Sequence, residues 1–220
     1  MRNVKNRILV CLSGKSSSGK SMLINRLKQD GYYTINLDQL IHQYYQRNQS
    51  GYDFVVENFG LEYVDENQVN RKKLGQLVFA NPDKLKLLSD FAGKIAKNHL
   101  KNLDYHGLVV VEGAAIYNNQ QRYLDIFDYF VLVERDEKLI QASILQKFAY
   151  LKDFDLKKWN PIKENKEFKA DLVIQNNGEI ETAYQELLKF LKKLVANVNC
   201  NPQIGENFIK VLNFKTKKWG

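Results

Sequence analysis

The residues best suited to chemistry form one short stretch near the N-terminus, which satisfies the Walker A pattern G-x-x-x-x-G-K-[ST]: Gly14, Lys15, Ser16, Ser17, Ser18, Gly19, Lys20 and Ser21. In this pattern the backbone N–H groups of the loop surround nucleotide phosphates, and the following helix directs its positive end at the same charge. Lys20 is expected to neutralise the β and γ phosphates, and Ser21 to place its hydroxyl on Mg²⁺. A Ser/Gly-rich surface turn is the alternative, but a chance match in this length has a probability of about one in a hundred. The stretch therefore predicts a nucleoside triphosphate site.

Two acidic residues stand where apolar runs end. Asp38 follows residues 33–37, and Glu112 follows residues 108–111. Ligands gather at the carboxyl ends of strands in parallel sheets. Asp38 could therefore accept a proton from an attacking hydroxyl, or it could cap the helix predicted from Gln39 onward. Glu112 could orient Mg²⁺, directly or through a water molecule, or it could be an ordinary acid at a strand end.

Four further polar residues are candidates for binding. His42 lies on the same helical face as Asp38, although a lone histidine is more often a surface or satisfied core residue. Arg71 could clamp a phosphate with two parallel hydrogen bonds, or it could be a solvated residue of a first helical turn. Asn176 and Asn177 follow the last apolar run and could contact an adenine edge, although they also suit a turn.

The elements that must position these residues alternate along the chain. Apolar runs predict strands at residues 8–12, 33–37, 108–111, 129–133 and 172–174, with helical patterns between most of them. This alternation predicts an α/β fold, in which helices cover both faces of a five-stranded parallel sheet. Residues 38–102 carry only helical patterns and are interpreted as an insertion that holds the acceptor. The lysine-rich residues 150–169 would suit a lid over the phosphates.

Composition limits the classes of function. The chain has 220 residues and a net charge of +8, which suits either a nucleic-acid surface or a site for phosphorylated small molecules. Most lysines are scattered as on solvated faces, whereas the basic tail, residues 199–220, could pack on its own domain or touch RNA or a membrane. No run approaches the length of a membrane span, and the two cysteines suggest reduced thiols in a cytoplasmic protein. Zinc-ligand spacing and a serine-hydrolase elbow are both absent from the sequence.

Several segments occur in an order and spacing that resemble one family, the dephospho-coenzyme A kinases, which are relatives of the nucleoside monophosphate kinases. Besides the Walker A loop, residues 35–42 resemble its D-A-D-x-I-A-[HR] segment, residues 70–75 its D-R-x-x-L-G, and residues 170–178 its A-D-x-V-I-x-N-x-G. The likeness extends from about residue 8 to residue 194. It implies a P-loop NTPase fold with a helical acceptor-binding insertion and a lid.

The resemblance also implies an activity. ATP, with Mg²⁺, would give its γ-phosphoryl group to the ribose 3′-hydroxyl of dephospho-coenzyme A, the last step of coenzyme A biosynthesis. Asp38 would be the general base, Lys20 would serve catalysis at the phosphates, and His42 and Arg71 would bind the acceptor. The nucleotide-binding core would comprise residues 1–37, 103–149 and 170–198, and the insertion residues 38–102.

Two of the departures from the family pattern concern the phosphate-binding loop and the lid. Lys15 and Ser17 replace two inner glycines of the loop. The arginines expected before the lid are missing, with Ser143 and Lys147 near those positions, and the residues that could substitute are Lys147, Lys163 and Lys166. Two alternatives follow: a P-loop kinase for another small acceptor such as a nucleoside or nucleotide, and a nucleotide-binding protein without transferase activity whose tail binds RNA or a partner.

Overall fold

The computed structural model describes residues 7–147 and 167–199, and the contacts divide the chain into two units. One unit contains residues 1–35 and 104–220, and the other contains residues 36–103. Most of the expected lid and nearly all of the basic tail lie outside the described residues.

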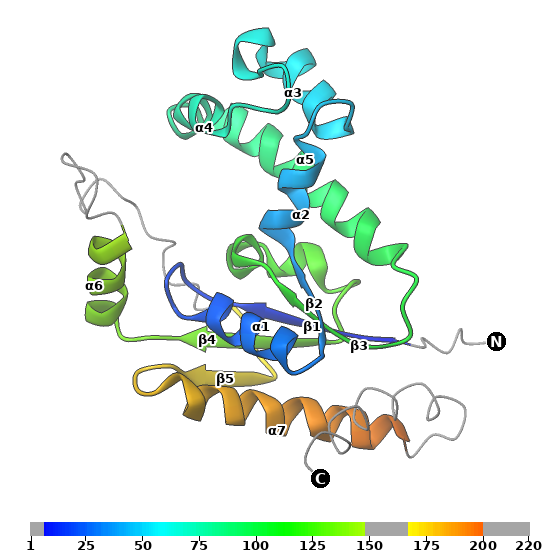
Figure 1. Cartoon of the computed structure of the whole chain (residues 1–220), viewed down its shortest axis with the longest axis vertical. Coiled ribbons are helices and arrows are strands. Elements are labelled where there is room, and N and C mark those ends of the chain that lie inside the picture. Colours follow the sequence, from blue (N-terminus) through cyan, green and yellow to red (C-terminus); the bar gives the residue numbers. More distant parts are fainter. Residues whose placement is uncertain (1–6, 148–166, 200–220) are drawn as a thin grey trace. The chain divides into compact units, whose positions relative to one another are not determined.

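The first unit is built on a five-stranded sheet with the order β2-β3-β1-β4-β5 (Figure 1). The strands are β1 (Arg7–Ser13), β2 (Tyr33–Asn36), β3 (Gly107–Glu112), β4 (Tyr129–Glu134) and β5 (Leu172–Gln175). Strand β1 pairs in parallel with β3 on one side and β4 on the other, and β5 pairs in parallel with β4. The prediction of a five-stranded parallel sheet is confirmed. Its central strand is β1, so the loop after β1 leaves the middle of the sheet.

Helices of the first unit cover this sheet. They are α1 (Lys20–Gln29), the 3₁₀ turns η2 (Ala114–Asn118) and η3 (Gln120–Tyr123), α6 (Glu137–Lys147) and α7 (Ile180–Asn199). Alternate residues of β1, including Val10, share a core with Leu27 of α1 and with Leu187 and Leu191 of α7. This confirms the apolar helical stripe of residues 180–195. Cys11 is fully buried, and burial raises the pKa of its thiol, which therefore stays protonated.

The second unit is helical. It contains α2 (Leu37–Tyr44), α3 (Ser50–Phe59), the 3₁₀ turn η1 (Leu61–Tyr63), α4 (Arg71–Phe79) and α5 (Pro82–Lys101). Val55, Phe59, Leu74 and Val78 form a separate buried cluster, so this unit has a core of its own. Its extended pairing is limited to two isolated bridges, at Gln46 with Gln68 and at Val64 with Val69. The expected run of helices without a strand is therefore present.

The boundary between β2 and α2 corrects the expected position of Asp38. Strand β2 ends at Asn36, whose side chain accepts a hydrogen bond of 2.9 Å from the backbone N–H of Gln39. Asn36 is thus the N-cap of α2, because asparagine satisfies an unpaired helix N–H as well as aspartate does. Asp38 lies in the first turn of the helix, neither at the strand end nor at the cap, and there its charge is favoured by the helix dipole.

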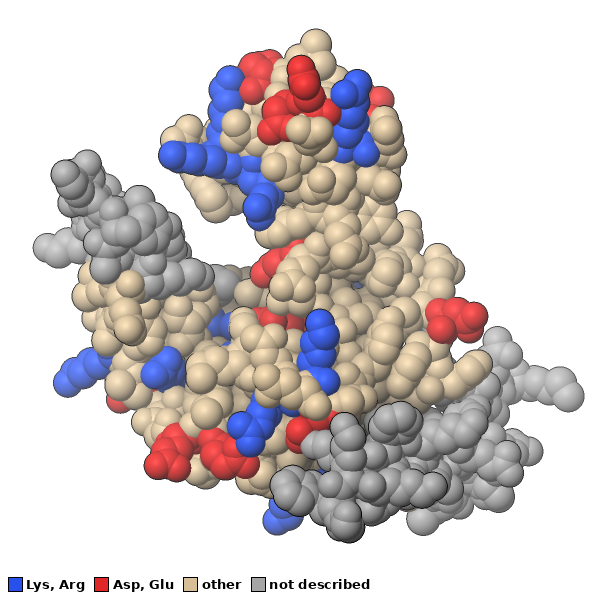
Figure 2. All heavy atoms as spheres, in the orientation of Figure 1, with Lys and Arg blue, Asp and Glu red and all other residues tan. Residues whose placement is uncertain are grey.

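Charged side chains are spread over the surface. Figure 2 shows basic and acidic side chains interspersed on the face that it presents, as expected for ordinary solvated helix faces. Among the described residues, no helix combines the length and the apolar character that a bilayer span requires.

Candidate functional site

The Walker A loop connects the central strand β1 to helix α1. Gly14 has a φ of +143°, and a Cβ there would lie 2.3 Å from the backbone oxygen of Val133 in β4. A glycine is therefore required where the loop passes against the neighbouring strand. Gly19, with a φ of +102°, precedes the first residue of α1. Ser17 also has a positive φ, +62°, so the loop adopts a left-handed conformation at a residue that carries a side chain.

Two lysines of the loop have different surroundings. Lys20 is only 4% exposed, and its Nζ donates to the backbone oxygens of Gly14 at 2.9 Å and of Lys15 at 2.6 Å. The Nζ of Lys15 instead pairs with Oε2 of Glu137, at 3.0 Å, and this pair is partly exposed. The structure therefore holds the Lys20 ammonium inside the loop and ties Lys15 to the first turn of α6.

Ser21 and Glu112 meet beside the loop. The Ser21 hydroxyl donates to Oε1 of Glu112 at 2.8 Å, and Glu112 is 7% exposed. The sheet order explains the meeting, since β3 pairs with β1 and places Glu112 opposite Leu12, just before the loop. Within residues 7–147 and 167–199, no group of three or more metal-ligating side chains occurs. Mg²⁺ at phosphate sites usually takes only one or two protein oxygens and completes its shell with water and phosphate, so this pair of hard oxygen donors fits the ion.

The two asparagines after β5 support the loop region. Asn176 is buried, and its Nδ2 donates to the backbone oxygen of Ser18 at 2.7 Å. Asn177 accepts a hydrogen bond of 2.7 Å from the backbone N–H of Asp136 through its Oδ1. Asn176 therefore braces the Walker A loop, and Asn177 braces the turn between β4 and α6.

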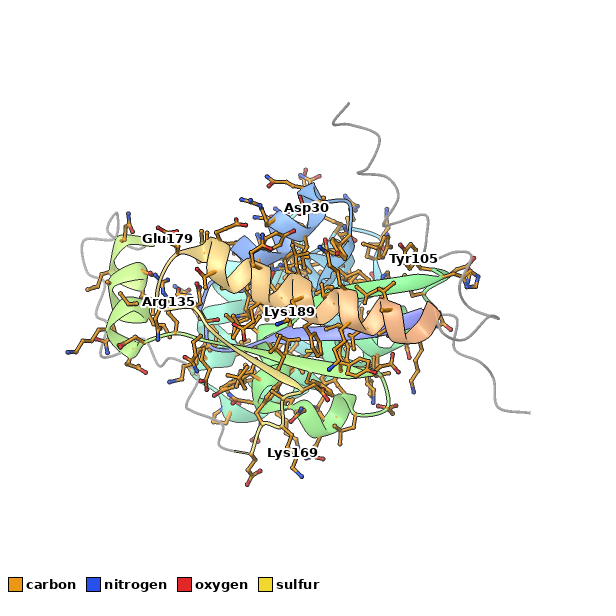
Figure 3. The ribbon with its side chains drawn as sticks, turned by 90° about the horizontal axis from the view of Figure 1, so that it is seen from below. Asp30, Tyr105, Arg135, Lys169, Glu179 and Lys189 are labelled. Atoms are coloured by element: carbon orange, nitrogen blue, oxygen red, sulfur yellow. The ribbon has the colours of Figure 1, made fainter. Side chains whose placement is uncertain are left out.

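Arg135 is a residue of the site that sequence reasoning missed. It follows β4 directly, and its Nη1 donates to the backbone oxygen of Ser17 at 3.3 Å and to the hydroxyl of Ser143 at 3.1 Å. In Figure 3 the residue is labelled where β4 leads into α6. Arg135 comes after a strand end, which is the signal that singled out Glu112, so the sequence could have pointed to it. Its place near the Walker A loop, however, depends on β4 lying next to β1.

A cavity opens at the carboxyl ends of β4 and β5, within the first unit. Its volume is about 220 Å³, and its walls combine residues of the loop, the two strand ends and the turns that follow them: Lys15, Tyr117, Leu132, Val133, Glu134, Arg135, Asp136, Gln175 and Asn177. The cavity is largely polar in its lining residues and adjoins the Walker A loop through Lys15. It is therefore placed to receive part of a nucleotide bound at that loop.

Three candidate residues of the acceptor site lie in the helical unit. Nη1 of Arg71, at the start of α4, lies 2.9 Å from Nδ1 and 2.8 Å from Nε2 of the His42 ring. Burial, and then the charge of Arg71, lower the pKa of His42 below its usual 6.5, while Asp38 opposes this shift. A neutral imidazole results, which can accept a hydrogen bond from the guanidinium. Asp38 is exposed, one helical turn before His42. Lys163 and Lys166 lie outside the described residues, as does the side chain of Lys147.

The architecture and the loop together define a class of protein. A parallel sheet with the order β2-β3-β1-β4-β5, a Walker A loop after the central strand, and a serine–glutamate pair at its edge are the features of P-loop kinases.

Comparison with known proteins identifies the family. The family model described as dephospho-CoA kinase matches residues 8–145. A dephospho-CoA kinase of Mycoplasma genitalium is 31% identical over 197 residues, which cover 88% of this chain and 96% of the relative. Among solved structures, a Thermus thermophilus protein aligns with a TM-score of 0.64 at 20% identity and covers 86% of this chain and 98% of its own. The dephospho-CoA kinase of Campylobacter jejuni aligns with a TM-score of 0.52 at 19% identity, covering 86% and 97%. These two structural matches establish the fold.

The chain belongs to the dephospho-CoA kinase family. It is accordingly a phosphotransferase, of a family that uses ATP as the phosphoryl donor. The sequence-based expectation of a P-loop kinase fold and of this family is confirmed.

Proposed function

We propose that this protein transfers the γ-phosphoryl group of Mg·ATP to the ribose 3′-hydroxyl of dephospho-coenzyme A. The observation that carries the proposal is the Walker A loop at the end of the central strand, with the buried Lys20 ammonium inside it and the Ser21–Glu112 pair beside it. Membership of the dephospho-CoA kinase family supports the choice of acceptor.

On the donor side, the chain supplies positive charge and oriented hydrogen-bond donors. Phosphoryl transfer needs little covalent help from a protein, and its rate depends on positioning and on stabilising the charge of the moving group. Lys20 would supply an ammonium at the β and γ phosphates. Ser21 and Glu112 would hold Mg²⁺, which when bound neutralises phosphate charge, with Glu112 acting directly or through a water molecule.

On the acceptor side, the helical unit would bind and activate the substrate. Arg71 has donors beyond the one that faces His42, and a guanidinium matches phosphate oxygens with parallel hydrogen bonds. The acceptor carries a diphosphate, so we assign the Arg71–His42 pair to that part of the molecule. Asp38, exposed in the first turn of α2, would accept the proton of the attacking hydroxyl.

The assignment of Asp38 can be tested with a matched pair of variants. Asp38→Asn keeps the size of the side chain but removes its ability to take up a proton at neutral pH, so we expect kcat to fall by 10²–10⁴-fold with ATP binding retained. Asp83 is also an exposed acid in a first helical turn, that of α5, and Asp83→Asn should leave kcat unchanged. Equal turnover in the Asp38 variant and the wild type would remove the general base from the proposal.

The role of Lys20 is tested in the same way. ADP release with Mg·ATP is measured with dephospho-coenzyme A and with a panel of nucleosides and nucleoside monophosphates. We expect stimulation by dephospho-coenzyme A, lost in Lys20→Ala and kept in Lys28→Ala, since Lys28 is exposed near the other end of the same helix. Stimulation by another acceptor would keep the mechanism and change the substrate. If no acceptor stimulated ADP release although the protein still bound ATP, the result would contradict transferase activity.

A further inference from the structure

Arg135 joins two elements at the edge of the candidate nucleotide site. It stands in the turn between β4 and α6, and β4 is a direct neighbour of the central strand (Figure 3). Its Nη1 contacts the backbone oxygen of Ser17 in the Walker A loop and the hydroxyl of Ser143 in α6. Both contacts use the same nitrogen, so they fix one end of the guanidinium and leave the rest of it available.

The remaining donors of Arg135 are not satisfied by the residues that the structure describes. A guanidinium carries five N–H donors and no acceptor. Nε is buried and has no hydrogen-bond partner within residues 7–147 and 167–199. A buried donor without a partner is costly, and native proteins keep such groups mainly where a ligand, water or ion completes them. Arg135 thus presents an unused, partly desolvated set of donors.

The chemistry of Arg135 favours an anion as the missing partner, because a guanidinium is positively charged and can only donate hydrogen bonds. Arg135 lines the cavity of about 220 Å³ next to the Walker A loop together with Lys15, whose ammonium is paired with Glu137. Glu134 and Asp136 also line this cavity, but their carboxylates accept hydrogen bonds elsewhere, from Nε2 of Gln175 and from the backbone N–H of Lys138. Neither carboxylate pairs with Arg135.

We propose that Arg135 is a phosphate-binding residue of the ATP site, with Nε and Nη2 donating to oxygens of the polyphosphate chain while Nη1 stays fixed against Ser17 and Ser143. This arrangement is the side-on bidentate contact that guanidinium groups make with phosphate. The inference rests on the proposed binding of ATP at the Walker A loop and adds a residue to that site. Arg135 would bring positive charge to the phosphates from the side of β4, whereas Lys20 brings it from within the loop.

The test measures binding of two ligands, ATP and inorganic tripolyphosphate, to the wild type and to variants. Arg135→Gln keeps a long stem and one amide donor but removes the charge and the fork. Loss of charge-assisted hydrogen bonds should weaken the binding of ATP and of tripolyphosphate by a similar factor, about 10- to 100-fold. Arg135→Lys keeps the charge without the fork and should weaken both ligands to an intermediate extent. Lys138→Ala removes one exposed cation of α6, the helix that follows Arg135, and should change the affinity for neither ligand by more than about twofold.

A purely structural role makes a different prediction. Ser143→Ala breaks the bridge between the loop and α6 but keeps the guanidinium. If Arg135 has only this bridging role, Ser143→Ala should weaken ATP binding as much as Arg135→Gln does. That result would overturn the proposal, as would an Arg135→Gln variant that binds ATP within twofold of the wild type. Loss of ATP affinity with tripolyphosphate unaffected would also overturn it, because Arg135 would then contact the base. Absence of ATP binding by the wild type would instead refute the proposed function itself.

Discussion

Replacement of Gly14 by alanine tests the close passage of the Walker A loop against β4. The φ of +143° disfavours any side chain, at a cost of about 1–2 kcal/mol. The new Cβ would also lie 2.3 Å from the backbone oxygen of Val133 in β4, and a backbone atom of a strand that is paired on both sides moves little. Overpacking of this kind costs about 1–3 kcal/mol. Gly14→Ala should therefore destabilise the protein by about 2–5 kcal/mol, which lowers Tm by roughly 4–20 °C in a chain of this size.

Two other glycines separate these contributions. Gly31 has a φ of +84° with nothing near its would-be Cβ, so Gly31→Ala should show the backbone cost alone, a fall in Tm of about 2–8 °C. Gly178 has neither a positive φ nor a near neighbour, so Gly178→Ala should be neutral or slightly stabilising. Thermal unfolding followed by circular dichroism, without ligand, gives the three values. Equal Tm values for Gly14→Ala and Gly31→Ala would refute the argument from the close contact with Val133.

Two further predictions concern the loop and the acceptor residues. Ser17→Gly removes a left-handed strain of about 1–2 kcal/mol, offset by about 0.5–1 kcal/mol of glycine entropy, so it should be neutral or stabilise by up to about 1.5 kcal/mol. Lys15→Gly changes a residue without a positive φ and should destabilise the protein. Chemical denaturation should therefore give a higher free energy of unfolding for Ser17→Gly than for Lys15→Gly, and the opposite order would contradict the argument from strain at Ser17. The pKa of His42 is lowered in the folded state, so the unfolded chain binds more protons than the folded chain just below pH 6.5. The free energy of unfolding that depends on neutral His42 is therefore complete above pH 6.5. It is lost as the pH falls towards the folded pKa. Unfolding between pH 5.5 and 7.5 should show that slope in the wild type and a flatter one in His42→Gln, and an unchanged slope would rule out His42 as its source.

Much of the fold could be predicted because its signals are local. Each strand carries a short apolar run, and α7 carries a buried stripe in which Leu187 and Leu191 are fully enclosed. The boundary at Asp38 was wrong, since Asn36 and Asp38 are both good caps and the sequence does not say which of them begins the helix; in the structure it is Asn36, which accepts from the backbone N–H of Gln39. Boundaries of this kind depend on the geometry of two or three residues.

The candidate site was predictable where a motif fixes the spacing and not where tertiary structure fixes it. The Walker A residues and Glu112 follow from a pattern and a strand end, and the structure brings Ser21 and Glu112 together. Arg135 was missed because its neighbours, Ser17 and Ser143, come from different parts of the chain. The family resemblance led us to expect an arginine near Ser143, and the structure instead places the guanidinium of Arg135, from the turn after β4, against that side chain. The contact with Ser17, in contrast, depends on the pairing of β4 with β1.

The proposed reaction is tested most directly by identifying the product that the protein forms from dephospho-coenzyme A and Mg·ATP. We predict one new phosphate monoester per ADP released, assigned to the ribose 3′ position by phosphorus NMR and mass spectrometry, with no product from Lys20→Ala. Release of ADP without a phosphorylated product, or a phosphate on a different hydroxyl or acceptor, would contradict the proposed reaction.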